Sequence, residues 1–131
     1  MATVALLSDE EAAPEARAVF DDIRATRGTD YVNNFWRALA HNPEELADVW
    51  SRIKTVMAPG ALDPLTKELI YIAVSAANGC GYCLHSHTAS ARARGMTPEI
   101  YAELLSVIAM ASRTNALANA LQVDTDERFK N

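Results

Sequence analysis

The chain contains little of what interrupts or cross-links a fold: among its 131 residues are five glycines, five prolines and two cysteines. Glycine and proline are the residues that helices tolerate least, and alanine, the best helix former, is abundant here. No segment alternates apolar and polar residues as a half-buried strand does, and no internal repeat is present. These absences favour an all-α fold.

The sequence also lacks a basic run and a long apolar run. The formal net charge is −5, and the lysines and arginines are scattered, which argues against nucleic acid as a partner. No apolar stretch approaches the roughly 18 to 20 residues that span a bilayer. The start, Met1–Val4, has neither the basic nor the apolar region of a signal peptide. We therefore expect no membrane partner and a cytoplasmic location.

The length predicts a single domain over residues 1–131. Helical spacing of apolar residues and terminal signals predict six or seven helices, with the last open to a break near 112–115. The expected ranges are 14–27, 32–41, 43–57, 64–77, 80–94 and 97–121, with an arm over 1–8 and a frayed polar tail over 124–131. A capping box at Ser8–Glu11 precedes the first range.

The helix expected over 64–77 is apolar nearly all round, which indicates a central helix or one at a subunit interface. Glu68 is a charge in this apolar company. Asn78–Gly79 ends the helix, and the next helix follows at once, so the two form a central hairpin. Because the chain is small and this helix is apolar nearly all round, we expect other subunits to cover part of its surface.

The hairpin carries both cysteines in the segment Asn78–His87. Each residue of a helix advances about 100°, so Cys80, Cys83 and His87 share one face, whereas His85 points elsewhere and is expected in solvent or at an interface. Cysteines three residues apart in a cytosolic protein are more typical of a redox or metal site than of a structural disulfide.

A thiolate is the reactive form of cysteine, and Cys83 lies in the first helical turn, where free amides and the dipole lower a thiol pKa. Attack of Cys83 on a peroxide gives a sulfenic acid, which a neighbouring thiol, here Cys80, converts to a disulfide. An outside dithiol then reduces that disulfide. His87 is placed to carry a proton. In an antiparallel hairpin, residues at similar distances from the turn lie opposite each other, so Glu68 is expected near His87.

The pattern Glu-x11-Cys-x2-Cys-x3-His, formed by Glu68, Cys80, Cys83 and His87, resembles the alkylhydroperoxidase D-like branch of the carboxymuconolactone decarboxylase superfamily. The flanking sequence is similar as well, in Lys67–Ser75 and in Ala91–Gly95, so that the strong match covers about residues 60–100.

The resemblance implies a helical fold that assembles as a homotrimer or homohexamer, and thiol-dependent reduction of hydroperoxides without a cofactor or metal. It makes Cys83 the peroxidatic cysteine and Cys80 the resolving one, with Glu68 and His87 as a proton relay that acts through Cys80. Tyr82 stands where the best-studied members carry a histidine, and is a candidate pocket residue.

Other interpretations remain open on the residues alone. The cysteines could be buried small side chains, or zinc ligands together with His87 and Glu68. Glu68 could instead be a surface carboxylate paired with Lys67 or Arg92. At the level of function, the alternatives are a lactone decarboxylase, as in the other branch of the superfamily, and a non-enzymatic helical module that binds metal or senses oxidants.

Overall fold

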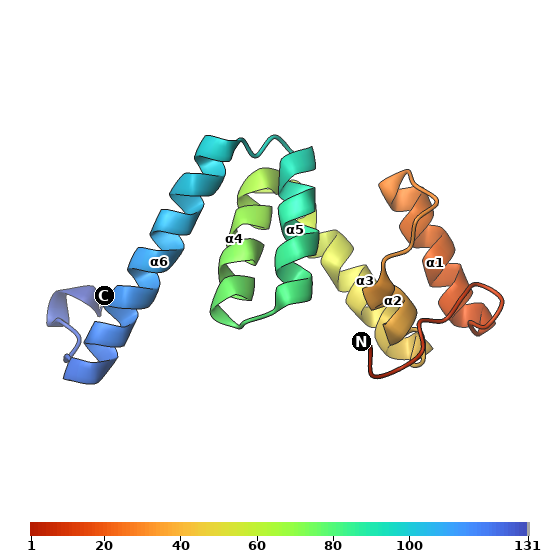
Figure 1. Ribbon diagram of the computed structural model, residues 1–131, viewed down its shortest axis with the longest axis horizontal. Coiled ribbons are helices and arrows are strands. Elements are labelled where there is room, and N and C mark those ends of the chain that lie inside the picture. Colours follow the sequence, from red (N-terminus) through yellow and green to blue (C-terminus); the bar gives the residue numbers. More distant parts are fainter. Residues whose placement is uncertain (131) are drawn as a thin grey trace. The chain divides into compact units, whose positions relative to one another are not determined.

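The computed structural model describes residues 1–130, and every regular element within them is helical. The elements are α1 Pro14–Arg27, α2 Asn34–Leu39, α3 Pro43–Met57, α4 Pro64–Ala77, α5 Gly81–Ala93, α6 Pro98–Leu121 and a 3-10 turn, η1, at Glu127–Phe129 (Figure 1). The all-α prediction is confirmed. Across the described part of the chain, none of the helices combines the length and the apolar character that a bilayer crossing requires.

The helices fall into two compact units, residues 1–58 with α1 to α3, and the chain from Pro59 onward with α4 to α6. The motif formed by Glu68, Cys80, Cys83 and His87 lies wholly in the second unit. A single domain over 1–131 stays a prediction.

The first unit packs around two tryptophans. The rings of Trp36 and Trp50 meet edge to face with centroids 5.4 Å apart, and the Trp50 indole donates to Asp22 Oδ2 at 2.6 Å. The buried stripes of the three helices complete this core, with Ala16, Phe20 and Ile23 from α1 and Leu46 from α3. Aromatic rings contribute most of the contact area in such a small core.

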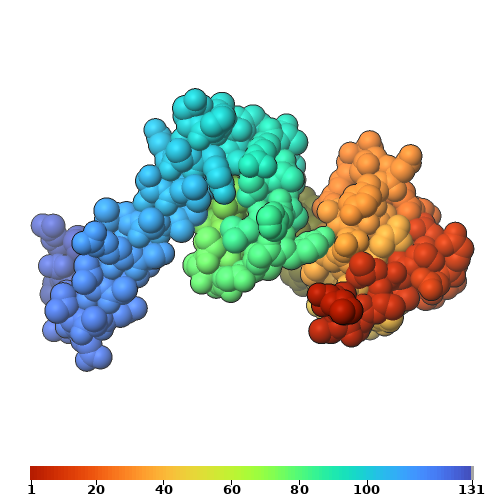
Figure 2. All heavy atoms as spheres, viewed as in Figure 1, coloured from red at the N-terminus to blue at the C-terminus, as the bar shows by residue number. Residues whose placement is uncertain are grey.

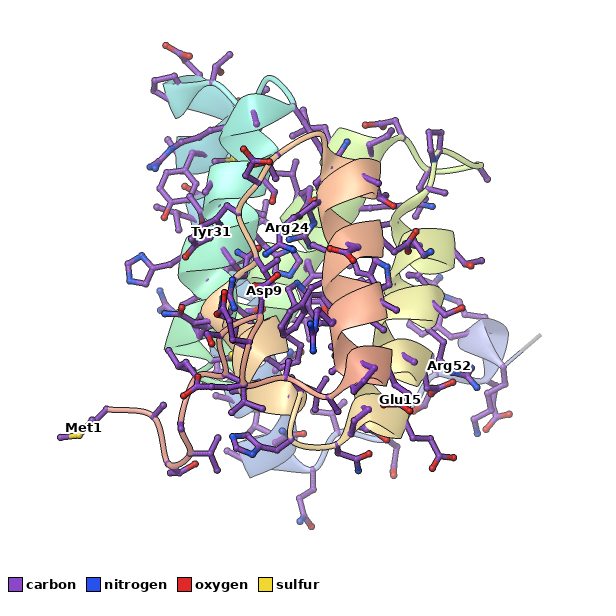
Figure 3. All side chains as sticks on the ribbon, turned by 90° about the vertical axis from the view of Figure 1, so that its right-hand side faces the viewer. Met1, Asp9, Glu15, Arg24, Tyr31 and Arg52 are labelled. Carbon is purple, nitrogen blue, oxygen red and sulfur yellow. The ribbon has the colours of Figure 1, made fainter. Side chains whose placement is uncertain are left out.

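A hydrogen bond from Arg37 to the Leu7 carbonyl and the carboxylate of Asp9 both hold the segment before α1. Asp9 forms ion pairs with Arg24 at 2.8 Å and with Arg37 at 3.2 Å, and Figure 3 shows Asp9 beside Arg24. The reciprocal bonds expected between Ser8 and Glu11 also form, at 2.9 and 3.2 Å, but around a turn that precedes α1.

Three boundaries differ from the sequence prediction. The helix expected over 32–41 is only Asn34–Leu39, because Asn33 is extended and Asn42 leaves the helical region to cap α3. The break that the sequence left open near 112–115 is absent: α6 is continuous, and the Thr114 hydroxyl donates to the Ala111 carbonyl within the helix. The polar tail contains η1 rather than only frayed chain.

In the second unit, α4 and α5 lie side by side and antiparallel, as the hairpin prediction required (Figure 1). Ile72, Ala91 and Met96 form its buried apolar centre, and the first half of α6 packs on it through Ile100, Tyr101, Leu104 and Ile108. The second half of α6 extends away from the hairpin (Figure 2). No residue of α6 is buried, although the helix is rich in apolar side chains.

Candidate active site

The turn between α4 and α5 sets the position of the dithiol. Gly79 has φ of +68°, in the left-handed region that glycine adopts without strain, and it reverses the chain after α4. The Cys80 amide then donates to the Ser75 carbonyl at 2.9 Å. Cys80 is thereby held as the N-cap of α5, with Cys83 one turn into the helix.

The sulfur of Cys80 accepts two hydrogen bonds at the start of α5, both from Cys83. The backbone amide of Cys83 donates to Cys80 Sγ at 3.3 Å, and the Cys83 thiol donates to the same sulfur. The thiol hydrogen bond and then the amide lower the pKa of Cys80 below its ordinary value, against a smaller opposing effect of burial. Both cysteines are free thiols and half-buried. Cys80 is therefore the thiol that ionises first.

Cys83 behaves in the opposite way. Burial raises its pKa to about 11, and the hydrogen bond to Cys80 and the charge of Cys80 add to the rise. The Ser75 hydroxyl donates to the Cys83 sulfur and lowers the pKa in part. The prediction that the helix start lowers the pKa of Cys83 is wrong for the reduced hairpin, because the Cys80 sulfur has taken the cap position and Cys83 is desolvated against α4.

Glu68 and His87 meet across the hairpin, as their similar distances from the turn predicted. His87 Nδ1 lies 2.7 Å from Glu68 Oε2, and Glu68 is only 4% exposed. The interpretation of Glu68 as a surface carboxylate is wrong, since its partners are His87 and Arg94 rather than Lys67 or Arg92. A carboxylate on Nδ1 favours the tautomer that leaves Nε2 of His87 available for proton transfer.

Three neighbours of the site were missed by the sequence reasoning: Tyr71, Ser75 and Arg94. The Tyr71 ring stacks on His87, with centroids 3.6 Å apart and planes 18° apart, and burial, then the charges of Cys83, Glu68 and Cys80, raise the pKa of Tyr71. Helical spacing could have found two of them, because Tyr71 and Ser75 lie three and seven residues after Glu68 on one face of α4.

The remaining candidates lie apart from this cluster or at its edge. His85 is exposed, as expected, and Tyr82 is 45% exposed. The role of Tyr82 as a pocket residue stays a prediction, as do the individual catalytic roles of Cys80, Cys83, His87 and Glu68. Within residues 1–130, no group of three or more His, Cys, Asp or Glu side chains is arranged to hold a metal ion.

Taken together, two adjacent helices carry a dithiol and a buried carboxylate–imidazole pair. The dithiol can give two electrons and two protons on closing to a disulfide. The arrangement suits thiol redox chemistry, in which a weak O–O or S–S bond is the electron acceptor.

Comparison with known proteins places the chain in a family. Residues 44–126 match the family model described as the carboxymuconolactone decarboxylase family. The chain is 37% identical over 91 residues to the alkyl hydroperoxide reductase AhpD of Solibacter usitatus, covering 70% of this chain and 50% of that protein. A second AhpD, from Maricaulis maris, is 30% identical over 97 residues, covering 72% of this chain and 54% of that protein. The chain thus spans about half the length of these relatives.

Among solved structures, the chain is similar to the crystal structure of the alkylhydroperoxidase AhpD core from Rhodospirillum rubrum. The two are 60% identical, the TM-score is 0.96, and the match covers 100% of this chain and 98% of that one.

Proposed function

Because the chain belongs to the carboxymuconolactone decarboxylase family and is AhpD-like, we propose that it is a thiol-dependent peroxidase that reduces hydroperoxides through a Cys80–Cys83 dithiol/disulfide cycle. The observation that carries the proposal is the pair of hydrogen-bonded free thiols at the start of α5, beside the buried Glu68–His87 contact. No cofactor is needed, because the two thiols supply both electrons.

The cycle balances in three steps. A cysteine thiolate attacks one oxygen of the hydroperoxide, the O–O bond breaks, and the products are a sulfenic acid and an alkoxide that takes up a proton. The second thiol attacks the sulfenic sulfur, which expels water and closes the disulfide. An external dithiol, as a protein or a small molecule, then reduces the disulfide by exchange and leaves as a disulfide itself.

The order of the two cysteines is the finer part of the proposal. We assign attack to Cys83 and resolution to Cys80. In the reduced hairpin the proton leaves Cys80 first, so attack by Cys83 is fastest when its proton passes to the Cys80 sulfur that it already contacts. From there the relay of His87 and Glu68 takes the proton, and the same relay returns one to the departing alkoxide.

The test is to weigh the reduced protein after an organic hydroperoxide is added and to follow peroxide consumption with several candidate dithiols. We expect the loss of two hydrogen atoms per chain and turnover with at least one dithiol. Unchanged mass together with free, unreactive thiols would contradict the proposal.

Single serine variants then assign the order. Trapping with a sulfenic-acid reagent is expected to label Cys83 in Cys80→Ser and to leave Cys80 in Cys83→Ser unlabelled. The opposite labelling reverses the two roles and keeps the cycle.

The assembly is a second part of the proposal. One side of α6 exposes the apolar side chains of Val107, Met110, Leu117 and Leu121. We assign this face to contacts between copies of the chain, in a homotrimer or homohexamer. Sedimentation is expected to give one of these masses, and Val107→Asp with Met110→Asp is expected to give smaller species of unchanged helicity. A wild-type monomer at micromolar concentration would contradict the assignment.

A further inference from the structure

Arg94 follows the last turn of α5 and contacts the buried carboxylate of Glu68. Its Nε lies 3.3 Å from Oε1, while the other oxygen, Oε2, lies 2.7 Å from Nδ1 of His87. One carboxylate therefore holds a guanidinium and an imidazole on separate oxygens. Glu68 is almost fully buried, whereas the Arg94 side chain is 43% exposed.

A carboxylate removed from water requires a compensating charge. Of its two partners, the guanidinium is charged at every relevant pH, whereas the imidazole is charged only when it takes a second proton. With Arg94 in place, the Glu68 charge is already balanced. His87 can then stay neutral, donate through Nδ1–H to Oε2, and leave Nε2 without a proton.

We propose that Arg94 is a positioning residue that, through Glu68, keeps the His87 ring neutral and in the tautomer whose Nε2 can accept a proton from the dithiol. In that step the S–H bond of a cysteine breaks and the N–H bond of Nε2 forms, and the proton later leaves with the alkoxide. The inference rests on the proposed function for its catalytic consequence, but its structural part concerns only the ring.

Other titratable groups lie on the helices that pack around this ring. Tyr71, on α4, stacks on it, and α5 contributes the thiols of Cys80 and Cys83. From α6, which packs on α4, Tyr101 reaches the apolar cluster of this unit. Among these groups Arg94 is the one permanent cation in contact with Glu68, which is why its removal is informative.

Three substitutions separate the charge from the hydrogen bond. Arg94→Lys keeps the charge. Arg94→Gln puts an amide nitrogen on Cδ, the same chain position as the arginine Nε, so it keeps a donor and loses the charge. Arg94→Met loses both. Arg92→Gln, on an exposed arginine two residues earlier, is the matched control.

Two measurements are made on each full-length variant: the pH profile of dithiol oxidation by an organic hydroperoxide, and the ¹⁵N resonances of the His87 ring, assigned with His87→Gln. In Arg94→Gln and Arg94→Met the uncompensated carboxylate favours a protonated ring, so both the acid limb of the profile and ring protonation move up by about one pH unit. Arg94→Met is expected to match Arg94→Gln, because the charge of Arg94 and not its hydrogen bond balances the carboxylate. Arg94→Lys and Arg92→Gln behave as wild type.

The outcomes distinguish this inference from the proposed function. The ring resonances of Arg94→Met unchanged from wild type would overturn the role of Arg94, whatever the peroxidase activity. Shifted resonances with no oxidation by peroxide, even in the wild type, would overturn the proposed function and retain the positioning of His87. Equal shifts in Arg92→Gln would reduce the effect to general surface charge and also overturn the inference. Circular dichroism checks that each variant keeps its helices, and Arg94→Gln serves alone if Arg94→Met does not fold.

Discussion

The Nδ1 atom of His87 on α5 lies 2.7 Å from Oε2 of Glu68 on α4, across the hairpin that the turn at Gly79 creates. The contact joins two residues 19 apart in the chain and buries the carboxylate between two helices. It fixes both the orientation of the imidazole and its tautomer, because the ring can satisfy the carboxylate only through Nδ1–H.

Glu68→Gln keeps the shape of the buried side chain but removes the charge. Peroxide turnover is expected to fall by about 10² because the proposed relay loses its carboxyl group. The free energy of unfolding is expected to fall by roughly 1 to 3 kcal/mol, since a buried polar partner is left poorly paired. Steady-state kinetics and urea denaturation measure the two effects.

The control for this change is Glu103→Gln, on an exposed carboxylate of α6 in the same unit. It is expected to match the wild type in both measurements. Wild-type turnover in Glu68→Gln would remove Glu68 from the mechanism.

The two thiols are expected to react with iodoacetamide at different pH. Because the pKa of Cys80 is lowered and that of Cys83 is raised to about 11, Cys80 has its thiolate at the lower pH and is alkylated first as pH rises. Peptide mapping by mass spectrometry gives the rate at each cysteine across the pH range.

Alanine variants test the cause of this difference. In Cys83→Ala, Cys80 loses its thiol donor and needs a higher pH for alkylation than in the wild type. In Cys80→Ala, Cys83 loses the partner's hydrogen bond and charge and reacts at a lower pH, although burial still holds its pKa above the ordinary value. Equal profiles for the two cysteines in the wild type would contradict the hydrogen-bonding pattern.

Ser75→Ala removes the hydroxyl that donates to the Cys83 sulfur. This hydroxyl lowers the pKa of Cys83, so its loss moves Cys83 alkylation to still higher pH and leaves Cys80 alkylation nearly unchanged. Ser86→Ala is the control, because the Ser86 hydroxyl donates to the Cys83 backbone carbonyl rather than to the sulfur. If both variants slow Cys83 alike, the effect is one of helix stability and not of the thiol.

Gly79→Ala tests the turn that holds the two helices together. Its φ of +68° is unfavourable for any residue with a Cβ, although a Cβ there would touch nothing, so strain alone acts. The free energy of unfolding is expected to fall by about 1 kcal/mol, measured by urea denaturation.

Gly81→Ala, two residues later, is the matched control. Gly81 begins α5 without a left-handed φ and also has open space for a Cβ, so alanine there leaves stability unchanged or raises it slightly. A loss of stability in Gly81→Ala as large as in Gly79→Ala would show that the strain argument is wrong.

Much of the second unit could be predicted because its signals are local. Asp63 before Pro64 marks the start of α4, Gly79 marks the turn, and Thr97 caps α6, and the structure has each of these. The spacing of Glu68, Cys80, Cys83 and His87 also reflects helix geometry that needs no knowledge of the rest of the chain.

The errors arose where local signals were incomplete. The spacing of apolar residues favoured a helix over 32–41, but the side chain of Asn42 is used to cap α3 and α2 stops at Leu39. A cluster of polar residues suggested a break in α6, yet Thr114 satisfies its hydroxyl within the helix. Both outcomes depend on where one hydrogen bond goes, which composition does not reveal.

By itself, the sequence determined the helices, the hairpin and which side chains share its inner face, because caps, breakers and helical periodicity act over a few residues. Three features follow from the packing of the helices: Arg94, not Arg92, balances Glu68, Tyr71 stacks on His87, and Cys80 ionises before Cys83. These depend on distance and burial between helices: one sulfur takes the cap of α5 while the other is desolvated against α4, and the energies of charge and solvation follow from that packing.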